Sequence, residues 1–373
     1  MKKSILLFSL SVILAAGGIT SCKDVIDDSE KPTAGASELD RKAVLTQWAD
    51  TLVIPGYQGF GGKLTAMKTQ TAAFTAAPTV AGLQSLRQSW REAYLEWQKV
   101  EVFEFGPAAD VSLANRFNIY PTDATGIRRN IASGTYNFEL ATAIPQQGFP
   151  ALDFLLNGIA ADDASIVQSY VTTANQRRYL TDVVNTMDQL LTGVRGQWNG
   201  PYRATFVNST GTNAGSSLSL LMNAYSRYYE HFLRTGKIGI PAGVMSGVAA
   251  PDKIEAFYFK GALPLQLAQA AHATVQNVFN GRAGQPSLKS YVNALGAKDS
   301  RTGESLTKLI NDQFATSSQQ LASLGPDLHA TMQSRNAAAV QSYNEMQKAV
   351  RLIKVDMTSA MSVSITYVDN DGD

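Results

Sequence analysis

The chain has 373 residues, of which 45% are apolar and 17% are charged. This composition is typical of a globular protein with a sizeable core and excludes a disordered chain. The 32 lysines and arginines balance 31 acidic residues to a formal charge of +1, and there is no long basic block. The chain therefore lacks the positive surface of a nucleic-acid-binding protein, and we expect no nucleic acid among its partners.

The N-terminus has the order of a bacterial export signal. A pair of lysines precedes an apolar run over residues 5–19, and small residues then lead to Cys22. The run is too short for a membrane-spanning helix and is typical of a signal peptide. Residues 18–22 resemble the lipobox of bacterial lipoproteins, in which the cysteine is lipidated and becomes the first mature residue. We therefore expect a signal peptide over residues 1–21 and a lipid on Cys22, with an ordinary signal peptide as the alternative.

The next segment, residues 22–37, is polar and has no periodicity. We expect it to be a flexible tether between the lipid and the folded part. Its basic and then acidic start resembles the short signal that directs some bacterial lipoproteins to the outside of the outer membrane. We therefore expect a lipid-anchored protein of the cell envelope, held at the outer membrane on its periplasmic or surface side. Cys22 is the only cysteine, so the folded part has no disulfide and no thiolate metal site.

In the folded part, apolar residues recur with helical spacing almost everywhere. A stretch over residues 193–215 is rich in Gly, Asn and Thr and marks a boundary between two domains, residues 38–200 and 201–373. No residues alternate for long enough to form a sheet, although the β-branched run 363–368 could form a strand. We expect an all-α fold of two helical bundles packed side by side, with the functional site in the cleft between them. The expected helices span residues 37–52, 57–74, 82–105, 148–158, 166–191 (one helix, or two with a break), 218–235, 254–281 (restarted at Pro264), 287–295, 304–324 and 326–355. Residues 237–243 are expected to form a loop.

The expected helix over residues 82–105 carries two acids where its apolar stripe ends. Trp90 and Trp97 belong to the stripe, and the same spacing continues to Glu101 and Glu104. Both carboxylates are therefore expected on the inward face, near the end of the helix.

Further polar candidates follow this helix. Tyr120 and Asp123 lie in an irregular connection, and Asp123 is suited to cap the next helix. Residues 148–158, GFPALDFLLNG, then predict a short buried helix with Pro150 in its first turn and an Asn-Gly end. Asp153 sets a carboxylate into its apolar face. An ionised carboxylate in such a position is strongly destabilising unless a partner compensates it.

Several kinds of site are disfavoured by the residue types. His231, His272 and His329 each stand alone, without the second ligand that a zinc site requires. The glycine-rich segments lack the pattern of a phosphate-binding loop, and no serine lies in a nucleophile elbow. The remaining candidates for a binding site in the cleft are Glu101, Tyr120, Asp123 and Asp153.

These candidates allow two arrangements. Carboxylates and a phenol could hold a hard cation such as an iron ion, with Glu101 and Asp153 as the metal ligands. They could equally pair with Arg116, Arg128 and Arg129 in a purely structural network. The spacing of the residues does not decide between the two.

Five segments in the same order resemble the imelysin-like family, and the similarity covers essentially the whole mature chain. The segments are residues 89–101, 105–107, 119–123, 148–158 and 369–373. The family is all-helical, with two similar four-helix-bundle domains and a functional site between them. Its members are envelope or periplasmic proteins associated with bacterial iron uptake. The resemblance therefore implies this fold and a receptor or transporter for iron uptake as the partner.

The signature of that family is G-x-H-x-x-E, and because of it the members were once classed as metallopeptidases. Gly148 matches the glycine, Pro150 stands in place of the histidine and Asp153 in place of the glutamate. Pro150 offers no ligand atom, and Asp153 keeps the charge on a shorter side chain. A zinc-peptidase mechanism would thus lose its main ligand.

Three functions follow from these observations. The first is a lipid-anchored, non-catalytic binding protein associated with iron uptake, with its site in the cleft. The second is a helical surface adaptor that holds a protein or a glycan. The third is a metal-dependent peptidase, which Pro150 disfavours.

Overall fold

The structure is a computed structural model that describes residues 34–334 and 336–367, with side chains from residue 40 onward. The predicted signal peptide, the lipidated Cys22 and most of the tether lie outside these residues. None of the described helices is both long enough and apolar enough to cross a membrane.

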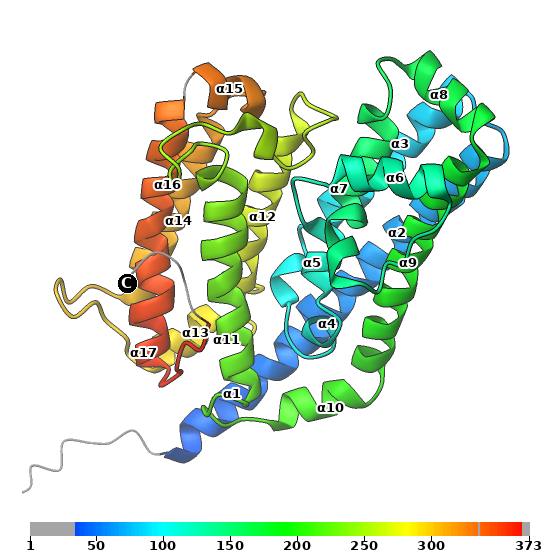
Figure 1. Cartoon of the computed structure of the whole chain (residues 1–373). Helices are drawn as coiled ribbons and strands as arrows, with labels where there is room; N and C mark the ends of the chain where they lie inside the picture. The colour runs from blue at the N-terminus through cyan, green and yellow to red at the C-terminus, as the bar shows by residue number, and fades with distance from the viewer. Residues whose placement is uncertain (1–33, 335, 368–373) are drawn as a thin grey trace, which may run out of the picture.

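The described residues are all-α, as the sequence predicts. The only β contact among them is an isolated antiparallel bridge between Lys298 and Ser305. The described part of the β-branched run, residues 363–367, forms no strand. The helices form two groups that stand side by side (Figure 1).

The first group contains the long helices α2, α3 and α9, with short helices packed around them (Figure 1). Its elements are α1 (Ala34–Trp48), η1 (Ala49–Val53), α2 (Ile54–Ala76), α3 (Val80–Trp97), η2 (Glu101–Phe103), α4 (Pro107–Asp110), α5 (Leu113–Asn118), α6 (Ala124–Ser133), η3 (Ala141–Gln146), α7 (Gly148–Asp153), η4 (Phe154–Gly158), α8 (Asp163–Thr172) and α9 (Ala174–Asn199).

The second group contains α11, α12, α14 and α16 as its long helices (Figure 1). Its elements are α11 (Ser217–Arg227), η5 (Tyr228–Gly239), η6 (Pro251–Lys253), α12 (Leu263–Asn280), α13 (Leu288–Ala294), α14 (Leu306–Ala322), α15 (Leu328–Ser334), α16 (Asn336–Arg351), η7 (Leu352–Met357) and α17 (Thr358–Ala360). Helix α10 (Pro201–Asn208) connects the two groups.

Part of the connection between the groups is helical. The predicted linker over residues 193–215 contains the end of α9, all of α10 and a non-helical stretch over residues 209–215 that leads to α11. Helix α10 lies beneath the first group and packs on α9, η1 and α1 (Figure 1). Helix α1 contacts α10, α11 and α13, so the first helix of the described chain lies under the second group. The division at residue 200 stays a prediction.

Helices α1, η1 and α2 run on without a break, although a break was expected at Pro55. Residues 49–53 form a π-helical turn, and Pro55 lies in the first turn of α2 directly after it. Because Pro55 has no N–H, the helical hydrogen-bond pattern lacks one donor at this point, and the π-helical turn directly before it marks the resulting irregularity.

Three predicted boundaries near the cleft are wrong. Helix α3 ends at Trp97, so Glu101 lies in the separate 3₁₀ turn η2. Lys237, which was expected in a loop, is part of the π-helical η5. Residues 254–262, expected to be helical, are irregular, with Ala256 at φ 54° in the left-handed region. Tertiary contacts of Lys237 and of residues 254–262 account for the last two differences.

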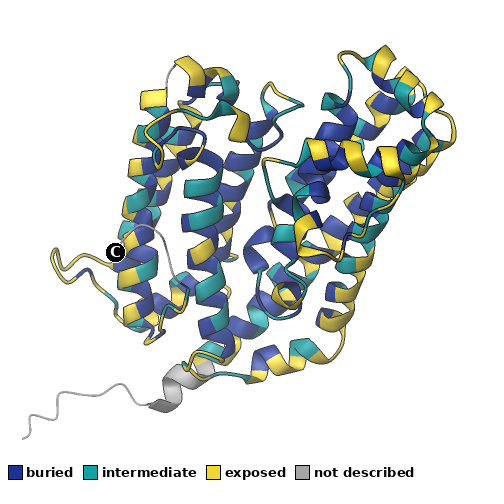
Figure 2. Cartoon of the chain, viewed as in Figure 1, coloured by how far each residue is buried: buried dark blue, intermediate teal, exposed yellow. Residues whose placement is uncertain are grey.

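The core of the first group is aromatic, and α7 lies within it. The ring of Phe149 stacks on that of Tyr94 with 4.3 Å between centroids and lies against Phe60, Trp97 and Phe117. All five are fully or almost fully buried. Buried residues line the inward faces of the long helices (Figure 2). The aromatic cluster therefore fixes α7 deep in the first group and orients the residues that follow Phe149.

Candidate functional site

The first residue of α7 must be a glycine. Gly148 has φ 76°, and a Cβ atom on it would lie 2.4 Å from the backbone oxygen of Phe117 in α5. A side chain is thus excluded both by the backbone conformation and by the close approach of α5. Trp90 supports the same turn, because its indole N–H donates to the backbone oxygen of Phe149 at 3.3 Å.

Asp153 at the end of α7 is 1% exposed, and it has one hydrogen-bond partner in each group of helices. Its Oδ2 accepts a hydrogen bond from the backbone N–H of Tyr258 at 2.7 Å, and its Oδ1 accepts one from the Asn157 amide at 3.0 Å. Burial raises the pKa of the Asp153 carboxyl to about 7, although these hydrogen bonds oppose the shift. The carboxyl group therefore titrates close to neutral pH.

The irregular segment that contains Tyr258 packs tightly on η4. A Cβ atom on Gly158 would lie 2.1 Å from the Tyr258 ring, and the Phe154 and Tyr258 rings lie 5.2 Å apart. The rings of Phe259 and Trp90 lie 5.6 Å apart. These contacts and the bond to Asp153 hold residues 254–259 against the first group, which explains why the segment is not helical.

A cavity of about 160 Å³ opens beside Asp153, between the two groups. Its lining includes residues of the connection after α5, of α7, and of the segment after η5. Among the lining residues are Tyr120, Pro150, Asp153, Asp252, Phe257 and Tyr258. Two of the four candidate site residues, Tyr120 and Asp153, therefore lie in one cavity at the boundary between the groups.

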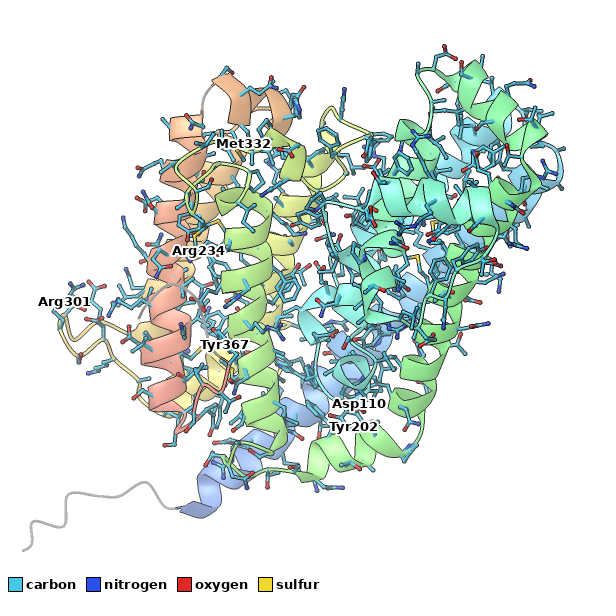
Figure 3. The ribbon with its side chains drawn as sticks, in the orientation of Figure 1. Asp110, Tyr202, Arg234, Arg301, Met332 and Tyr367 are labelled. Atoms are coloured by element: carbon cyan, nitrogen blue, oxygen red, sulfur yellow. The ribbon has the colours of Figure 1, made fainter. Side chains whose placement is uncertain are left out.

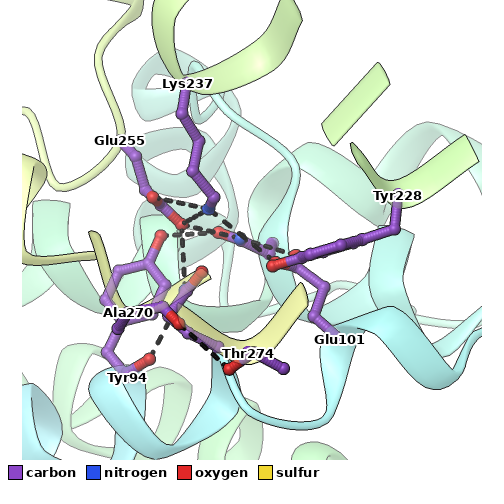
Figure 4. A network of polar contacts seen from close by, with 9 residues as sticks. Tyr94, Glu101, Tyr228, Lys237, Glu255, Ala270 and Thr274 are labelled. Atoms are coloured by element: carbon purple, nitrogen blue, oxygen red, sulfur yellow. Dashed lines mark hydrogen bonds and ion pairs between the residues drawn. The ribbon is translucent and has the colours of Figure 1, made fainter. Parts of the chain in front are cut away.

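Glu101 lies instead in a buried polar network that also crosses this boundary (Figure 4). Lys237 of the second group places its Nζ 2.7 Å from Oε2 of Glu255 and 3.7 Å from Oε2 of Glu101. The Tyr228 hydroxyl donates to Oε2 of Glu101 at 3.3 Å. Burial raises the pKa of Glu101, and the positive charge of Lys237 opposes that shift. One ammonium group thus compensates two buried carboxylates.

Asn118 connects the two acids from the side of the first group. Its amide donates to Oε1 of Glu101 and to Oε1 of Glu255, both at 2.8 Å, and its own oxygen accepts from the Tyr94 hydroxyl at 2.5 Å. The Gln98 amide also donates to Glu255, at 3.3 Å. Most of the polar groups of this network are therefore satisfied within the protein.

The other predicted residues have separate roles. Asp123 caps α6, as expected, by accepting from the N–H of Gly126 at 2.8 Å, and it does not line the cavity. Tyr120 is half-buried, and its hydroxyl reaches η5 of the second group. The contact is close, because a Cβ atom added to Gly236 would lie 3.2 Å from this hydroxyl. Glu104 accepts from the N–H of Ala114, and burial raises the pKa of its carboxyl to about 8.

The arginines that were considered as partners of these acids bind elsewhere. Arg116 pairs with Glu139 at 2.9 Å, Arg128 donates to the backbone oxygen of Ile159, and Arg129 is exposed. Sequence reasoning missed Lys237, Asn118 and Glu255, which provide the compensation. No local pattern marks them, because their burial arises only where the two groups meet.

The expected metal site does not fit this geometry. Glu101 and Asp153 share no hydrogen-bond partner, and the ammonium group of Lys237 already compensates Glu101. Within residues 34–334 and 336–367 no three His, Cys, Asp or Glu side chains are placed to hold a metal ion together. His272 is packed in the core, where it is 1% exposed, and burial lowers its pKa to about 4. A resident metal between Glu101 and Asp153 therefore stays a prediction that the geometry does not favour.

A larger hollow, of about 710 Å³, lies away from all of these residues. It is bounded by helices α14 and α16 and by the loop that carries Arg301, which projects from the second group (Figure 3). Two of the acids in it are already paired, Asp299 with Arg351 and Asp312 with Lys308. We therefore take the smaller cavity beside Asp153 as the candidate site.

The chain is similar to known proteins over most of its length. A family model described as Imelysin matches residues 53–355. A protein named iron-regulated protein A from Synechococcus elongatus is 23% identical over 281 residues, which are 74% of this chain and 73% of that protein.

Two solved structures share the fold. An imelysin-like protein from Psychrobacter arcticum superposes with a TM-score of 0.68 at 19% identity, over 88% of this chain and 98% of that one. A protein from Parabacteroides distasonis, described as a precursor of iron-regulated protein A, superposes with a TM-score of 0.69 at 18% identity, over 88% and 97%. At these identities the two structures support the fold alone.

Proposed function

The chain belongs to the imelysin family, and on this basis we propose that it is a lipid-anchored binding protein of the cell envelope that acts in iron uptake without catalysing a reaction. Its ligand site is the cavity beside Asp153, between the two groups of helices. Its partners are the membrane that holds its lipid and the receptor or transporter components of an iron-uptake system. It resides at the outer membrane, on the periplasmic or the surface side.

The association with iron rests on the names of relatives. The curated relative is called iron-regulated protein A, and one of the two solved structures is described as a precursor of a protein with that name. The location in the envelope rests on the lipobox-like end of the N-terminal segment at Cys22.

The cavity is the observation that carries the proposal. It combines a buried carboxyl group, a phenol and aromatic rings at the boundary between two groups of helices. Boundaries of this kind are where polar groups from several elements converge around a ligand. The cavity also contains Tyr120 and Asp153, which the sequence singles out without knowledge of the fold.

The absence of catalysis is proposed because of Pro150. This residue lines the cavity at the position where the family signature has a histidine, and it has no atom that could bind a metal or move a proton. A peptidase would need another base or metal ligand in its place.

The finer fold is part of the proposal. We take the two groups as two similar four-helix-bundle domains, residues 38–200 and 201–373. The similarity to imelysin-like structures and the two sets of long helices in Figure 1 support this division.

A helical adaptor for a protein or a glycan is the second candidate. One observation favours it: the acids Glu101 and Glu255 are paired with Lys237 and are thus not available to an ion. An adaptor would retain a macromolecular partner equally well in iron-rich and in iron-free medium.

The proposed role is tested in cells that lack the gene. We expect these cells to take up radioactive iron more slowly than the parent when iron is scarce, and a copy of the gene to restore the rate. Uptake that is unchanged by the deletion would contradict a role in iron uptake.

A further inference from the structure

The cavity beside Asp153 has an acidic lining. Asp153 is buried in its wall, Asp252 is exposed, and no basic side chain lines it. Arg87 and Arg128 act electrostatically on Asp153 and Tyr258, but both donate to backbone carbonyls outside the cavity. Above pH 7, where the Asp153 carboxyl is ionised, its charge and the Asp252 carboxylate around a small hollow with low-dielectric walls produce a negative potential inside it. The charge of the cavity therefore favours a cation.

The remaining lining suits an organic cation. Tyr120, Phe257 and Tyr258 bring three aromatic rings to the cavity. The face of such a ring attracts an ammonium group that lies within about 6 Å of its centroid. Ile254 and Ala256 add aliphatic surface, against which methylene groups can pack.

A bare metal ion fits the same lining poorly. Hard cations take about six to eight oxygen ligands, or keep several of their waters. The charged ligands here are the two carboxylates of Asp153 and Asp252, set among rings and proline side chains. An ammonium group needs only a few acceptors, because it has three N–H donors, and the rings add to its binding.

The size of the cavity limits what enters it. Pockets that enclose a whole small molecule have volumes of about 300 to 1,000 Å³. The cavity measures about 160 Å³, so it admits one end of a ligand and leaves the rest outside. A short alkyl chain that ends in a charged group has a suitable shape.

We propose that this cavity binds a primary ammonium group at the end of a short alkyl chain, with the Asp153 carboxylate as its ion-pair partner. The inference deepens the proposed function and rests on it for the role of the site. The same group occurs in two sources: the aminoalkyl arm of an iron chelate, and a lysine side chain of a partner protein.

The first test compares two probes on the purified full-length protein in detergent. Pentylammonium chloride and 1-pentanol have the same alkyl chain, but only the former carries a charge. By calorimetry at pH 8 we expect saturable binding of pentylammonium, with 1-pentanol at least about tenfold weaker. Equal binding of the two probes, or no binding of pentylammonium, would overturn the proposal.

The second test assigns the binding to Asp153. We expect Asp153→Asn to bind pentylammonium about tenfold more weakly, because the amide keeps the shape but loses the charge. Asp188→Asn removes a partly exposed carboxylate that pairs with Lys68 and does not line the cavity, so this variant should bind as the wild type does. Undiminished binding by Asp153→Asn would contradict the proposal. If this variant does not fold, the comparison of the two probes on the wild type still decides.

Two pairs of competitors identify the source. One is a ferric trihydroxamate with a free aminopentyl arm and its N-acetylated form, and the other is a lysine peptide and its acetyl-lysine form. If the free amine of only one pair displaces pentylammonium, and its acetylated form does not, that pair identifies the source of the ammonium group. Displacement that is independent of acetylation overturns the proposal. If the protein is required for iron uptake but does not bind pentylammonium, only this inference is refuted. If it binds pentylammonium but is not required for iron uptake, only the proposed function is refuted.

Discussion

Lys237 and Glu101 belong to different groups of helices, and 3.7 Å separates Nζ of the lysine from Oε2 of the glutamate. Both side chains are no more than 2% exposed. The same Nζ lies 2.7 Å from Oε2 of Glu255. The charge balance of the buried boundary between the two groups thus depends on a single lysine.

Replacement of this lysine is expected to destabilise the protein strongly. Lys237→Met leaves two buried carboxylates without a counter-charge, and loss of one partner of a buried pair costs about 3 to 5 kcal/mol. Urea denaturation measures the change in the free energy of unfolding. Lys308→Met, which removes an exposed lysine that pairs with Asp312, is the control and should cost no more than about 1 kcal/mol.

A second variant separates lost charge balance from lost packing. In Lys237→Met/Glu255→Gln one of the uncompensated charges is also removed, so we expect part of the lost stability to return. A double variant as unstable as the sum of its single changes would show that the ammonium group does not compensate Glu255.

The stability of the protein is expected to fall as the pH rises from about 4 to neutral values. The folded-state pKa of Asp153 is raised to about 7, so the folded chain retains a proton between pH 4 and 7 that the unfolded chain has lost. The buried carboxyl therefore stabilises the fold at low pH, and this contribution disappears as the pH rises to 7. Glu104, with a pKa raised to about 8, acts in the same direction.

Asp153→Asn isolates this contribution, because the amide does not titrate. Between pH 5 and pH 8 we expect the wild type to lose about 3 kcal/mol more than this variant, given a factor of 1.36 kcal/mol per pKa unit. Urea denaturation at several pH values provides the two curves. Asp188→Asn should follow the wild type, and parallel curves for Asp153→Asn would show that the Asp153 pKa is not raised.

The turn before α7 depends on glycine. Gly148→Ala forces a side chain into a left-handed backbone and against the Phe117 carbonyl, so we expect a loss of about 2 to 4 kcal/mol. Gly193→Ala is the matched control. Gly193 lies inside α9 with open space around it, so alanine there should stabilise the protein by about 0.5 to 1 kcal/mol. Thermal unfolding of both variants measures the change in stability, which should be a loss for Gly148→Ala and a gain for Gly193→Ala.

Local patterns predicted the centre of the site. The apolar run, Pro150 in the first turn and the Asn-Gly end are signals within residues 148–158, and the structure has a buried helical segment there with Asp153 in its apolar face. The cap at Asp123 was predicted for the same reason, since a capping residue acts on the helix that directly follows it.

The surroundings of the site could not be predicted in this way. Residues 254–260 have apolar residues at a helical spacing, but their conformation follows from the bonds of Tyr258 to Asp153 and of Glu255 to Lys237. The partner of Glu101 is likewise distant in the chain. Such contacts between groups leave no periodic signal in the sequence, so both the end of α3 and the role of Lys237 were missed.

We propose that the cavity beside Asp153 serves iron uptake. The most direct test of this role is the rate of uptake of radioactive iron by cells that carry Asp153→Asn in place of the wild-type protein. The control strain carries Asp188→Asn, and the amount of each protein in the envelope is matched by immunoblot. We expect uptake in the Asp153→Asn strain to fall to the rate of the deletion strain and uptake in the control strain to stay at the wild-type rate. Wild-type uptake by the Asp153→Asn strain, with the protein present in normal amount, would contradict the account.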